Sequence, residues 1–417
     1  MPILLNISQL ATCPPDNPQH DAGLIRDAAL VWRGKQIVWA GPRHQLPHSF
    51  SSEPVTDCGA RLVIPGLLDC HTHLCFGGWR ADEFEQRLEG VSYQEIRQAG
   101  GGIARTVAAT RGTGMAQLLR KTSDILDQML ALGITTVECK SGYGLDHDTE
   151  IKQLEVYRHL QAEHVIDLVP TFLGAHVIPA EYAHNRQAYV DFLCRVMIPE
   201  LVNQDLVRFC DIFVEDGAFS ADEARQVLGA ARQFGLGIKI HADQLSDGGG
   251  AQLAAEMAAS SAEHLEYISD AGISALAEAG VVAVSLPLAS LYLTERYLPA
   301  RKLLDAGVRV AVATDFNPGS APSFHLPLAL TLACLYQSMT PSEVLMGATT
   351  VAARALRLDR QRGCLAAGFD ADITIIDAPD LSHWLYHFKP NACRAVIKQG
   401  QWVHPAADFR LPPTPMT

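Results

Sequence analysis

Eight short runs rich in Val, Ile, Leu and Thr recur along the central part of the chain, and the segments between them carry apolar residues at helical spacing. A short run that is apolar throughout is typical of a strand buried on both faces of a parallel sheet. Residues 115–132 and 221–234 predict two of the intervening helices, with Ser220 as the N-cap of the second. The predicted strands are residues 62–68, 134–139, 166–173, 209–214, 237–240, 261–265, 281–286 and 309–313.

This alternation of strand and helix predicts a (β/α)8 TIM-like barrel rather than an open doubly wound sheet. The polar residues provide an independent check, because many chemically reactive side chains fall at or just after the predicted strand ends. Barrels of this kind carry their chemistry at the carboxyl ends of the strands. The residues at these positions are His71, His73, Glu138, Lys140, His176, Glu215, His241, His264, Ser285 and Asp315.

The two ends of the chain do not follow the barrel rhythm. Both contain short alternating segments typical of strands, at residues 28–32, 36–40, 371–376 and 394–398. We expect residues 1–60 and 363–417 to pair into one small β-sandwich domain, beside a barrel domain of residues 61–362.

The charge balance restricts the possible partners. Lys and Arg total 33 against 46 Asp and Glu, which gives a formal net charge of −13. Such a chain offers no basic stripe for phosphates, so we expect a small-molecule substrate and no nucleic-acid partner. Hydrophobic residues make up 48% of the 417 residues and charged residues 19%, as in an ordinary globular enzyme.

Membrane and export signals are weak in this sequence. The longest apolar run, residues 279–293, is interrupted by Ser285, Pro287 and Ser290 and is shorter than the roughly 20 residues that span a bilayer. The first residues lack a basic segment followed by a long apolar one. The ten cysteines include no CxxC pair, which favours reduced thiols. We therefore expect a cytoplasmic protein without a membrane partner.

The segment PGLLDCHTHL places His71 and His73 two residues apart at the end of the first predicted strand. Side chains two apart on an extended backbone point to the same face, so both imidazoles can bind one ion. Alone, this pair is weak evidence for a metal and is better explained by two ordinary hydrogen-bonded histidines.

His241 in KIHADQ and Asp315 in VATDFNPG follow the fifth and eighth predicted strands. Taken singly, His241 could be a core histidine and Asp315 a turn or N-cap residue. Together with His71 and His73 they supply three imidazoles and a carboxylate, a set that suits zinc or ferrous iron and leaves room for water. The combination predicts one divalent metal ion per chain.

Longer segments resemble the amidohydrolase superfamily and, within it, enzymes of histidine degradation that open an imidazolone ring. The resemblance covers nearly the whole chain. The HxH and the late Asp are shared by the superfamily, whereas GGWRADEF, KSGYGL and TFLGAH resemble this group of enzymes in particular. The segments that carry it are PGLLDCHTHLCFGGWRADEFEQRLEG, SYQEIRQAGGGI, TTVECKSGYGL, TFLGAHVIPAEY, KIHADQLSDGGG, SAEHLEY and ATDFNPGSAP.

The resemblance implies hydrolysis of 4-imidazolone-5-propanoate to N-formimidoyl-L-glutamate by a metal-activated water, in a homodimer. It implies metal ligation by His71, His73, His241 and Asp315. It also implies a substrate pocket lined by Arg80, Tyr143, His176, Gln244, Asn317, Gly319 and Ser320.

Three features depart from the usual pattern of these enzymes. Some members have Glu where this chain has Gln244, which cannot accept a proton as a base. Ser320 stands where Thr is common, and residues 286–298 follow the pattern only loosely. We therefore expect Asp315 to move the proton and His264 to orient the water or contact the developing oxyanion.

Arg80 follows His71 by nine residues, on the loop after the first predicted strand. A propionate carboxylate needs a cationic and preferably bidentate partner, which a guanidinium provides. The alternative is an exposed arginine paired with Asp82 or Glu83.

Two other functions stay open at this point. Another amidohydrolase reaction, such as deamination or opening of a different cyclic amide, would use the same metal ligands. A non-catalytic binding or scaffold protein that had lost its metal is disfavoured by the complete ligand set. An assay on several ring substrates and a metal analysis would separate these alternatives.

Overall fold

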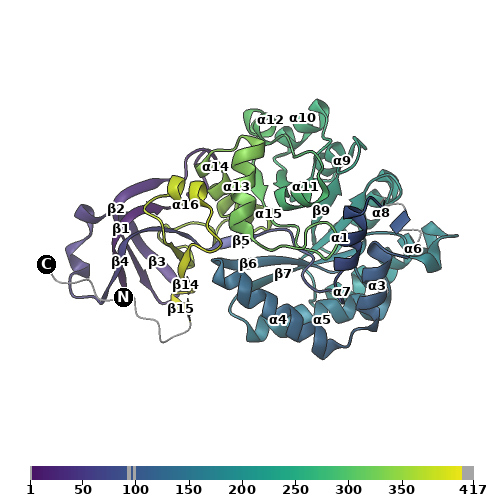
Figure 1. Ribbon diagram of the computed structural model, residues 1–417, viewed down its shortest axis with the longest axis horizontal. Coiled ribbons are helices and arrows are strands. Elements are labelled where there is room, and N and C mark those ends of the chain that lie inside the picture. The colour runs from purple at the N-terminus through teal and green to yellow at the C-terminus, as the bar shows by residue number, and fades with distance from the viewer. Residues whose placement is uncertain (1, 92–94, 97–99, 406–417) are drawn as a thin grey trace.

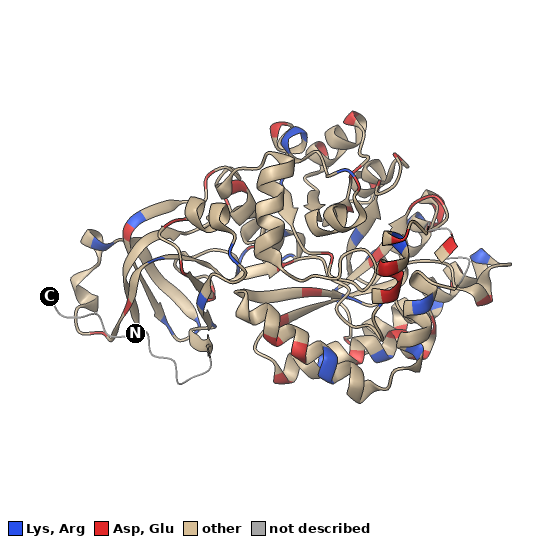
Figure 2. Cartoon of the chain, in the orientation of Figure 1, with Lys and Arg blue, Asp and Glu red and all other residues tan. Residues whose placement is uncertain are grey.

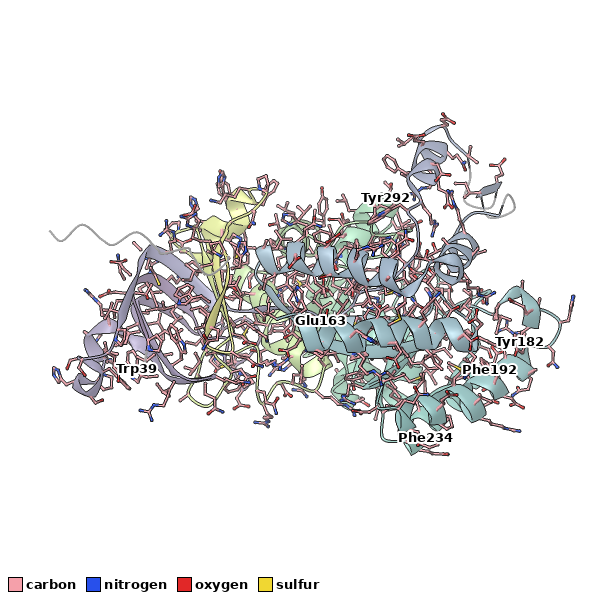
Figure 3. The ribbon with its side chains drawn as sticks, turned by 90° about the horizontal axis from the view of Figure 1, so that it is seen from below. Trp39, Glu163, Tyr182, Phe192, Phe234 and Tyr292 are labelled. Carbon is pink, nitrogen blue, oxygen red and sulfur yellow. The ribbon has the colours of Figure 1, made fainter. Side chains whose placement is uncertain are left out.

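A parallel barrel and a separate terminal sheet form the molecule, as a computed structural model of residues 2–91, 95–96 and 100–405 shows (Figure 1). Viewed as in Figure 3, Trp39 of the terminal sheet and Tyr182 lie toward opposite ends of the long axis. The expected (β/α)8 barrel with a small β domain built from both termini is confirmed.

The barrel contains eight parallel strands whose spatial order follows the sequence. Apart from the first, each predicted strand matches an observed one to within a few residues. The strands are β5 (Leu67–Asp69), β6 (Ile134–Lys140), β7 (Asp167–Ala175), β8 (Phe209–Val214), β9 (Gly237–Ala242), β10 (Ser261–His264), β11 (Val282–Ser285) and β12 (Val310–Val312).

The two edge strands of this sheet, β5 and β12, meet just beyond their carboxyl ends. Thr72 forms a parallel bridge with Phe316. The backbone N–H of Asp315 donates to the carbonyl of His71 at 3.0 Å, and that of His73 donates to the carbonyl of Phe316 at 2.8 Å. The closing seam of the barrel therefore places the HxH segment directly against Asp315.

The prediction of a single barrel strand at residues 62–68 is wrong. Its first part belongs to β4 (Val55–Pro65) of the terminal sheet, and only the part after Gly66 enters the barrel as β5. A Cβ at Gly66 would lie 2.4 Å from Oγ1 of Thr135, so the chain passes between the two sheets where a side chain has no room. Hydrophobicity is continuous across Gly66 because both sheets bury their strands there.

The terminal sheet has seven strands in the order β15-β14-β13-β4-β1-β2-β3. The sheet curls over its own core, so that β2 and β15 approach each other. The indole Nε1 of Trp32 in β2 donates to the carbonyl of Gly400, beside β15, at 3.0 Å. Its other strands are β1 (Ile3–Ala11), β2 (Leu24–Arg33), β3 (Gln36–Pro42), β13 (Ile373–Ile376), β14 (Cys393–Lys398) and β15 (Gln401–His404). The domain boundaries at residues 60 and 363 stay a prediction, and β4 crosses the first of them.

Helices cover the outside of the barrel, and acidic and basic positions are interspersed along them (Figure 2). The two predicted helices are α4 (Met115–Ala131) and α8 (Ala221–Gln233), and Ser220 caps α8 in a capping box with Glu223. The others are α1 (Ala81–Leu88), α3 (Ile103–Gly112), α5 (His147–Glu163), α6 (Arg186–Phe192), α7 (Ile198–Asn203), α9 (Gly250–Glu256), α10 (Asp270–Ala279), α11 (Pro287–Leu293), α12 (Ala300–Asp305), α13 (Leu326–Gln337), α14 (Pro341–Gly347), α15 (Thr350–Ala355) and α16 (Leu381–His387). Within the described part of the chain, we find no helix with the length and apolarity to cross a membrane.

Candidate active site

The four predicted metal ligands lie together at the carboxyl ends of the barrel strands, and all four are buried. Oδ1 of Asp315 lies 3.4 Å from Nε2 of His71 and 3.4 Å from Nε2 of His73. Nε2 of His241 lies 3.5 Å from Nε2 of His73. His71, His73 and Asp315 thus form one group of mutually close ligand atoms, and His241 approaches it through His73.

Three of the six separations among these four atoms match the edges of a tetrahedral metal site, whereas His241 does not lie within 4.8 Å of all three of the other ligand atoms. With metal–ligand bonds of about 2.0 to 2.1 Å, neighbouring ligand atoms in a tetrahedron are about 3.3 to 3.4 Å apart, and the observed separations are 3.4, 3.4 and 3.5 Å. Both ring nitrogens of His71 are buried without a hydrogen-bond partner among the described residues, and Oδ1 of Asp315 lies 3.4 Å from Nε2. The donor set suits zinc or ferrous iron.

The protonation states of two of these histidines also suit a metal. Burial lowers the pKa of His73 to about 4, and burial together with the nearby His71 lowers the pKa of His241 well below its usual range. Both imidazoles are therefore neutral at pH 7, the form in which histidine binds metals.

His71 and Asp315 form an oppositely charged pair in the metal-free protein. Burial and the Lys140 ammonium lower the pKa of His71, but Glu263 and Asp315 outweigh them and raise it to about 9. Burial alone would raise the pKa of Asp315, yet His71 and His73 hold it well below its usual range. A cation binding here would replace the proton on His71.

The backbone around this centre is strained at one proposed metal ligand, Asp315, and at the neighbouring His264. Asp315 has φ +56° and His264 has φ +76°, in the left-handed region that side chains with a Cβ rarely adopt. Such positions cluster at functional sites, where the surrounding structure holds a side chain in a required direction.

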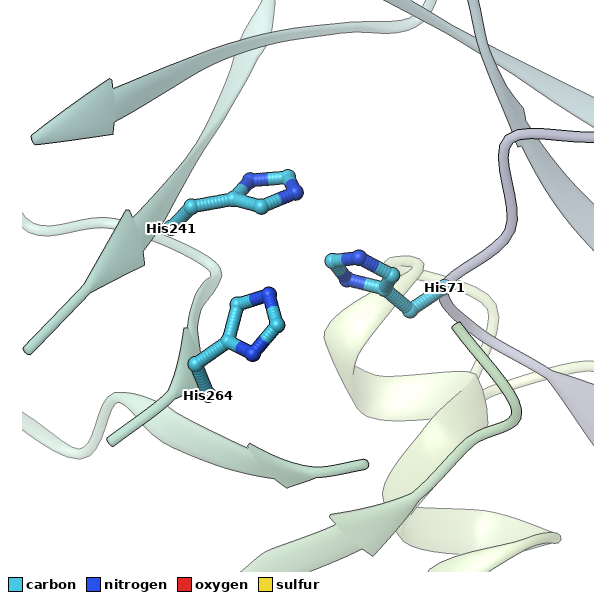
Figure 4. A group of neighbouring side chains, drawn as sticks. All are labelled: His71, His241 and His264. Carbon is cyan, nitrogen blue, oxygen red and sulfur yellow. The ribbon is translucent and has the colours of Figure 1, made fainter. Parts of the chain in front are cut away.

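His264, at the end of β10, turns its ring toward the same point (Figure 4). Its ring centroid lies 5.8 Å from that of His71 and 5.4 Å from that of His241. A ring nitrogen of each of these three residues lies within 4.8 Å of the other two. His264 therefore borders the centre beside His71 and His241.

A pocket of about 460 Å³ opens beside this centre. It brings together the substrate-binding positions implied by the sequence resemblance. Those among its lining residues are Arg80, Tyr143, His176, Gln244, Asn317, Gly319 and Ser320.

Arg80 is held in the pocket wall by two contacts. Its Nε lies 2.8 Å from Oε2 of Glu83, the alternative partner named above, yet its side chain is only 13% exposed. A Cβ at Gly319 would lie 2.4 Å from Nη1 of Arg80, so the guanidinium packs directly against the glycine backbone. The Glu83 contact occupies Nε, and among the described residues we find no hydrogen-bond partner for the two Nη groups.

The loop after Asp315 is organised by Asn317. The Asn317 side chain donates to the carbonyl of Asp315 at 2.6 Å and accepts from the N–H groups of Gly319 and Ser320 at 2.8 and 2.7 Å. Ser320 Oγ lies 3.4 Å from Oδ2 of Asp315. Asn317 is thereby engaged within the loop and fixes the shape of this pocket wall.

Tyr143 and His176 form the wall next to His73. The rings of His73 and His176 are stacked with centroids 5.3 Å apart, and the ring of Tyr143 lies 5.5 Å from that of His176. Nδ1 of His176 lies 3.0 Å from the carbonyl of Gly142, which leaves Nε2 toward the pocket. Burial lowers the pKa of His176 to about 4, so this ring is neutral at pH 7.

The sequence analysis missed several residues of the site. Glu83 was named only as a competing partner of Arg80, yet it lines the pocket. Leu293 and Glu295 also line it, so residues 286–298 supply part of the pocket wall. Asp211 and Glu263, which face Nδ1 of two metal-binding histidines, were not singled out. For Asp211 the available signal was a charged residue inside the otherwise apolar strand β8.

Comparison with known proteins places this architecture in a family. A model of the amidohydrolase family matches residues 62–403. The chain is 45% identical to an imidazolonepropionase of Symbiobacterium thermophilum, over 92% of this chain and 91% of that protein. It is 44% identical to an imidazolonepropionase of Anaeromyxobacter dehalogenans, over 97% and 96% of the two chains.

Solved structures share the fold at low identity. A triazine hydrolase variant has a TM-score of 0.75 at 19% identity, over 96% of this chain and 94% of that one. A zinc-bound adenosine deaminase from Xanthomonas campestris has a TM-score of 0.69 at 18% identity, over 96% and 92%. These solved structures show the fold that the chain shares with them, whereas the sequence relatives show the family to which it belongs. The chain belongs to the amidohydrolase family and, within it, to the imidazolonepropionases.

Proposed function

We propose that this chain hydrolyses the cyclic amide C–N bond of 4-imidazolone-5-propanoate to give N-formimidoyl-L-glutamate, with one divalent cation held by His71, His73, His241 and Asp315. The observation that carries the proposal is the close approach of these ligands beside a pocket lined by Arg80: Oδ1 of Asp315 lies 3.4 Å from Nε2 of His71 and of His73, and Nε2 of His241 lies 3.5 Å from Nε2 of His73. Relatives more than 40% identical over nearly the whole chain bear the name of this activity. The cation is zinc or iron.

His71, His73, His241 and Asp315 would hold the cation, which when bound would lower the pKa of water toward about 7 and so would supply a nucleophile at neutral pH. Asp315 is placed to take the proton at a carboxylate oxygen and pass it to the departing ring nitrogen. His264, which lies beside His71 and His241, orients the water or contacts the developing oxyanion. Gln244 lines the pocket and contributes hydrogen bonds but no base.

Arg80 binds the propionate carboxylate through its Nη groups and so orients the ring over the centre. Tyr143 and His176 contact the polar edge of the planar ring. Asn317, Gly319 and Ser320 shape the opposite wall.

The proposal also includes a homodimer in the cytoplasm, as the sequence resemblance implies. The ten cysteines are all free, which agrees with a reducing compartment. Size-exclusion chromatography with light scattering tests the dimer.

The deciding experiment for the activity follows formation of N-formimidoyl-L-glutamate from freshly prepared substrate with purified, metal-loaded protein. Dihydropyrimidines, hydantoins and aminated rings serve as competitors for specificity. Faster turnover of any of these than of the imidazolone would overturn the substrate assignment.

A further inference from the structure

Five ionisable side chains are buried together inside the barrel, beneath the proposed metal ligands. Barrel interiors are ordinarily filled by branched apolar side chains, so a layer of charges there is exceptional. We call this group the buried charge cluster, and each of its members has no exposed side-chain surface. It consists of Glu138 and Lys140 of β6, Asp211 of β8, Lys239 of β9 and Glu263 of β10.

Lys140 lies at the centre of the cluster. Its Nζ lies 2.8 Å from Oε1 of Glu138, 2.7 Å from Oδ2 of Asp211 and 3.1 Å from Oε2 of Glu263. An ammonium has three N–H donors, and here each has a carboxylate acceptor. Lys140 therefore joins strands β6, β8 and β10 at one point.

Lys239 completes the arrangement. Its Nζ lies 2.7 Å from Oε1 of Glu263 and 3.2 Å from the carbonyl of Cys70, the residue before His71. Three carboxylates against two ammonium groups leave the cluster with one negative charge in excess.

That negative charge lies against the imidazoles of the metal centre. Oδ2 of Asp211 is 3.0 Å from Nδ1 of His241, and Oε2 of Glu263 is 2.8 Å from Nδ1 of His71. These are the same two oxygen atoms that Lys140 contacts. A carboxylate beside Nδ1 favours a proton on that nitrogen, which leaves the lone pair on Nε2, where the cation would bind.

We propose that Lys140 is a positioning residue for the metal centre, which holds Asp211 and Glu263 so that they fix the rings of His241 and His71 with Nε2 toward the cation. The inference rests on the metal ligation proposed above. It assigns a role to a lysine that touches neither substrate nor metal.

The cost of the cluster supports this role over a purely structural one. Burying charged groups carries a desolvation penalty, and replacing buried ion pairs by apolar side chains of similar volume is often neutral or stabilising. An apolar layer would therefore serve the barrel core at least as well. What an apolar layer could not do is present two oriented carboxylates to two imidazoles.

The experiment measures the Zn²⁺ affinity of metal-stripped protein by competition with a chromogenic chelator. Lys140→Met should weaken Zn²⁺ binding about 10- to 100-fold, the range known for lost partners of metal-binding histidines. If Lys140 acted only through its charge, removing a cation near the site would instead tighten binding. Weaker binding is therefore specific to positioning.

Lys398→Met is the matched control. Lys398 is also a buried lysine held by two carboxylates, Asp372 and Asp167, but it belongs to β14 of the terminal sheet. Both variants should lose stability in urea, whereas only the Lys140 variant should lose Zn²⁺ affinity. Equal losses of affinity in both would overturn the proposal.

A double variant, Lys140→Met with Glu138→Gln, guards against failure of the single variant to fold. It removes one positive and one negative charge, so the excess charge of the cluster is unchanged, and Glu138 faces neither imidazole. Binding about tenfold weaker than wild type is expected, together with an altered visible absorption spectrum of the Co²⁺-loaded protein. Zn²⁺ affinity within twofold of wild type would overturn the positioning role, whereas a wild-type chain that binds no divalent metal would overturn the proposed function itself.

Discussion

The Nε of Arg80 lies 2.8 Å from Oε2 of Glu83, and the other carboxylate oxygen of Glu83 accepts from the N–H of Gly102 at 3.0 Å. Glu83 is buried, so the pair is shielded from solvent and fixes the plane of the guanidinium. The Nη groups of Arg80 are consequently presented to the pocket in one orientation. This arrangement suits recognition of a carboxylate far from the bond to be broken.

Arg80→Ala should lower kcat/KM while leaving the metal content unchanged. Removing one partner of a shielded, charge-assisted contact costs roughly 2 to 5 kcal/mol, which corresponds to a loss of about 30-fold to several thousandfold. Arg80→Lys should recover only part of the activity, because an ammonium cannot reproduce the planar fork. Steady-state kinetics on 4-imidazolone-5-propanoate provide the measurement.

The control for Arg80 is an imidazolone that lacks the propionate. Wild-type protein should process this ring poorly, and Arg80→Ala should lose little more on it, because the contact is already absent. Equal losses on both substrates would mean that Arg80 supports the loop or the metal centre instead.

Metal content provides a second prediction. One equivalent of zinc or iron per chain is expected, because the candidate ligand groups of the described residues overlap at His71 and His241 and so surround one centre. His71→Ala and Asp315→Ala should each remove metal and activity together, since a four-ligand site rarely tolerates the loss of one ligand. Elemental analysis of purified protein measures this, and two equivalents in fully active protein would contradict it.

The sequence predicted seven of the eight barrel strands because each is a short apolar run between turn-forming residues. It failed at Gly66, where one apolar run serves two sheets, and local hydrophobicity carries no information about which sheet a strand joins. Strand β1, at Ile3–Ala11, was also missed. Its pairing partners β2 and β4 lie on both sides of it, so its burial depends on tertiary structure.

The candidate site was predictable as far as it depends on strand ends. His71, His73, His241 and Asp315 all follow apolar runs, and a parallel barrel brings such positions together whatever the details of packing. The carboxylates that face these histidines were not predictable, because Glu263 lies 192 residues from His71 in the sequence and their contact depends on the exact register of the strands.

His264→Ala should lower kcat about 10² to 10⁴-fold, the range for loss of one acid–base or orienting group. Zn²⁺ content should be retained, because the four proposed ligands remain. A carboxylate at position 244 should not be required for activity, since the wild-type chain has Gln244 there and is expected to be active without a base at this position. Full turnover in the His264 variant would show that this residue has another role.

His176 predicts a dependence of stability on pH. Burial lowers its pKa to about 4, whereas in the unfolded chain the value is about 6.5. Between these values the unfolded state binds more protons, so the free energy of unfolding falls as the pH drops from 6.5 toward 4, by on the order of 3 kcal/mol from this residue. Urea unfolding of His176→Gln between pH 7 and 4.5 should show a shallower fall than wild type, and the exposed His20→Gln should not.

The contact between Arg80 and Gly319 gives the most selective test of the pocket. An added Cβ at Gly319 would lie 2.4 Å from Nη1 and 3.1 Å from Cζ of Arg80, far inside van der Waals contact. Gly319 does not have a positive φ, so Gly319→Ala brings a steric effect without backbone strain. The guanidinium must move, and we expect a rise in KM for the propionate substrate of about tenfold or more, at nearly unchanged metal content and melting temperature.

A matched variant separates this effect from a general effect of adding a methyl group. Gly229→Ala adds a Cβ on the outer helix α8, where nothing lies within 4 Å, and it should leave KM unchanged. On the ring that lacks the propionate, Gly319→Ala should behave like wild type, because the displaced arginine has no carboxylate to bind. If Gly319→Ala instead lowered kcat equally on both substrates, the glycine would be required for the loop that carries Asp315, and Arg80 would be independent of it.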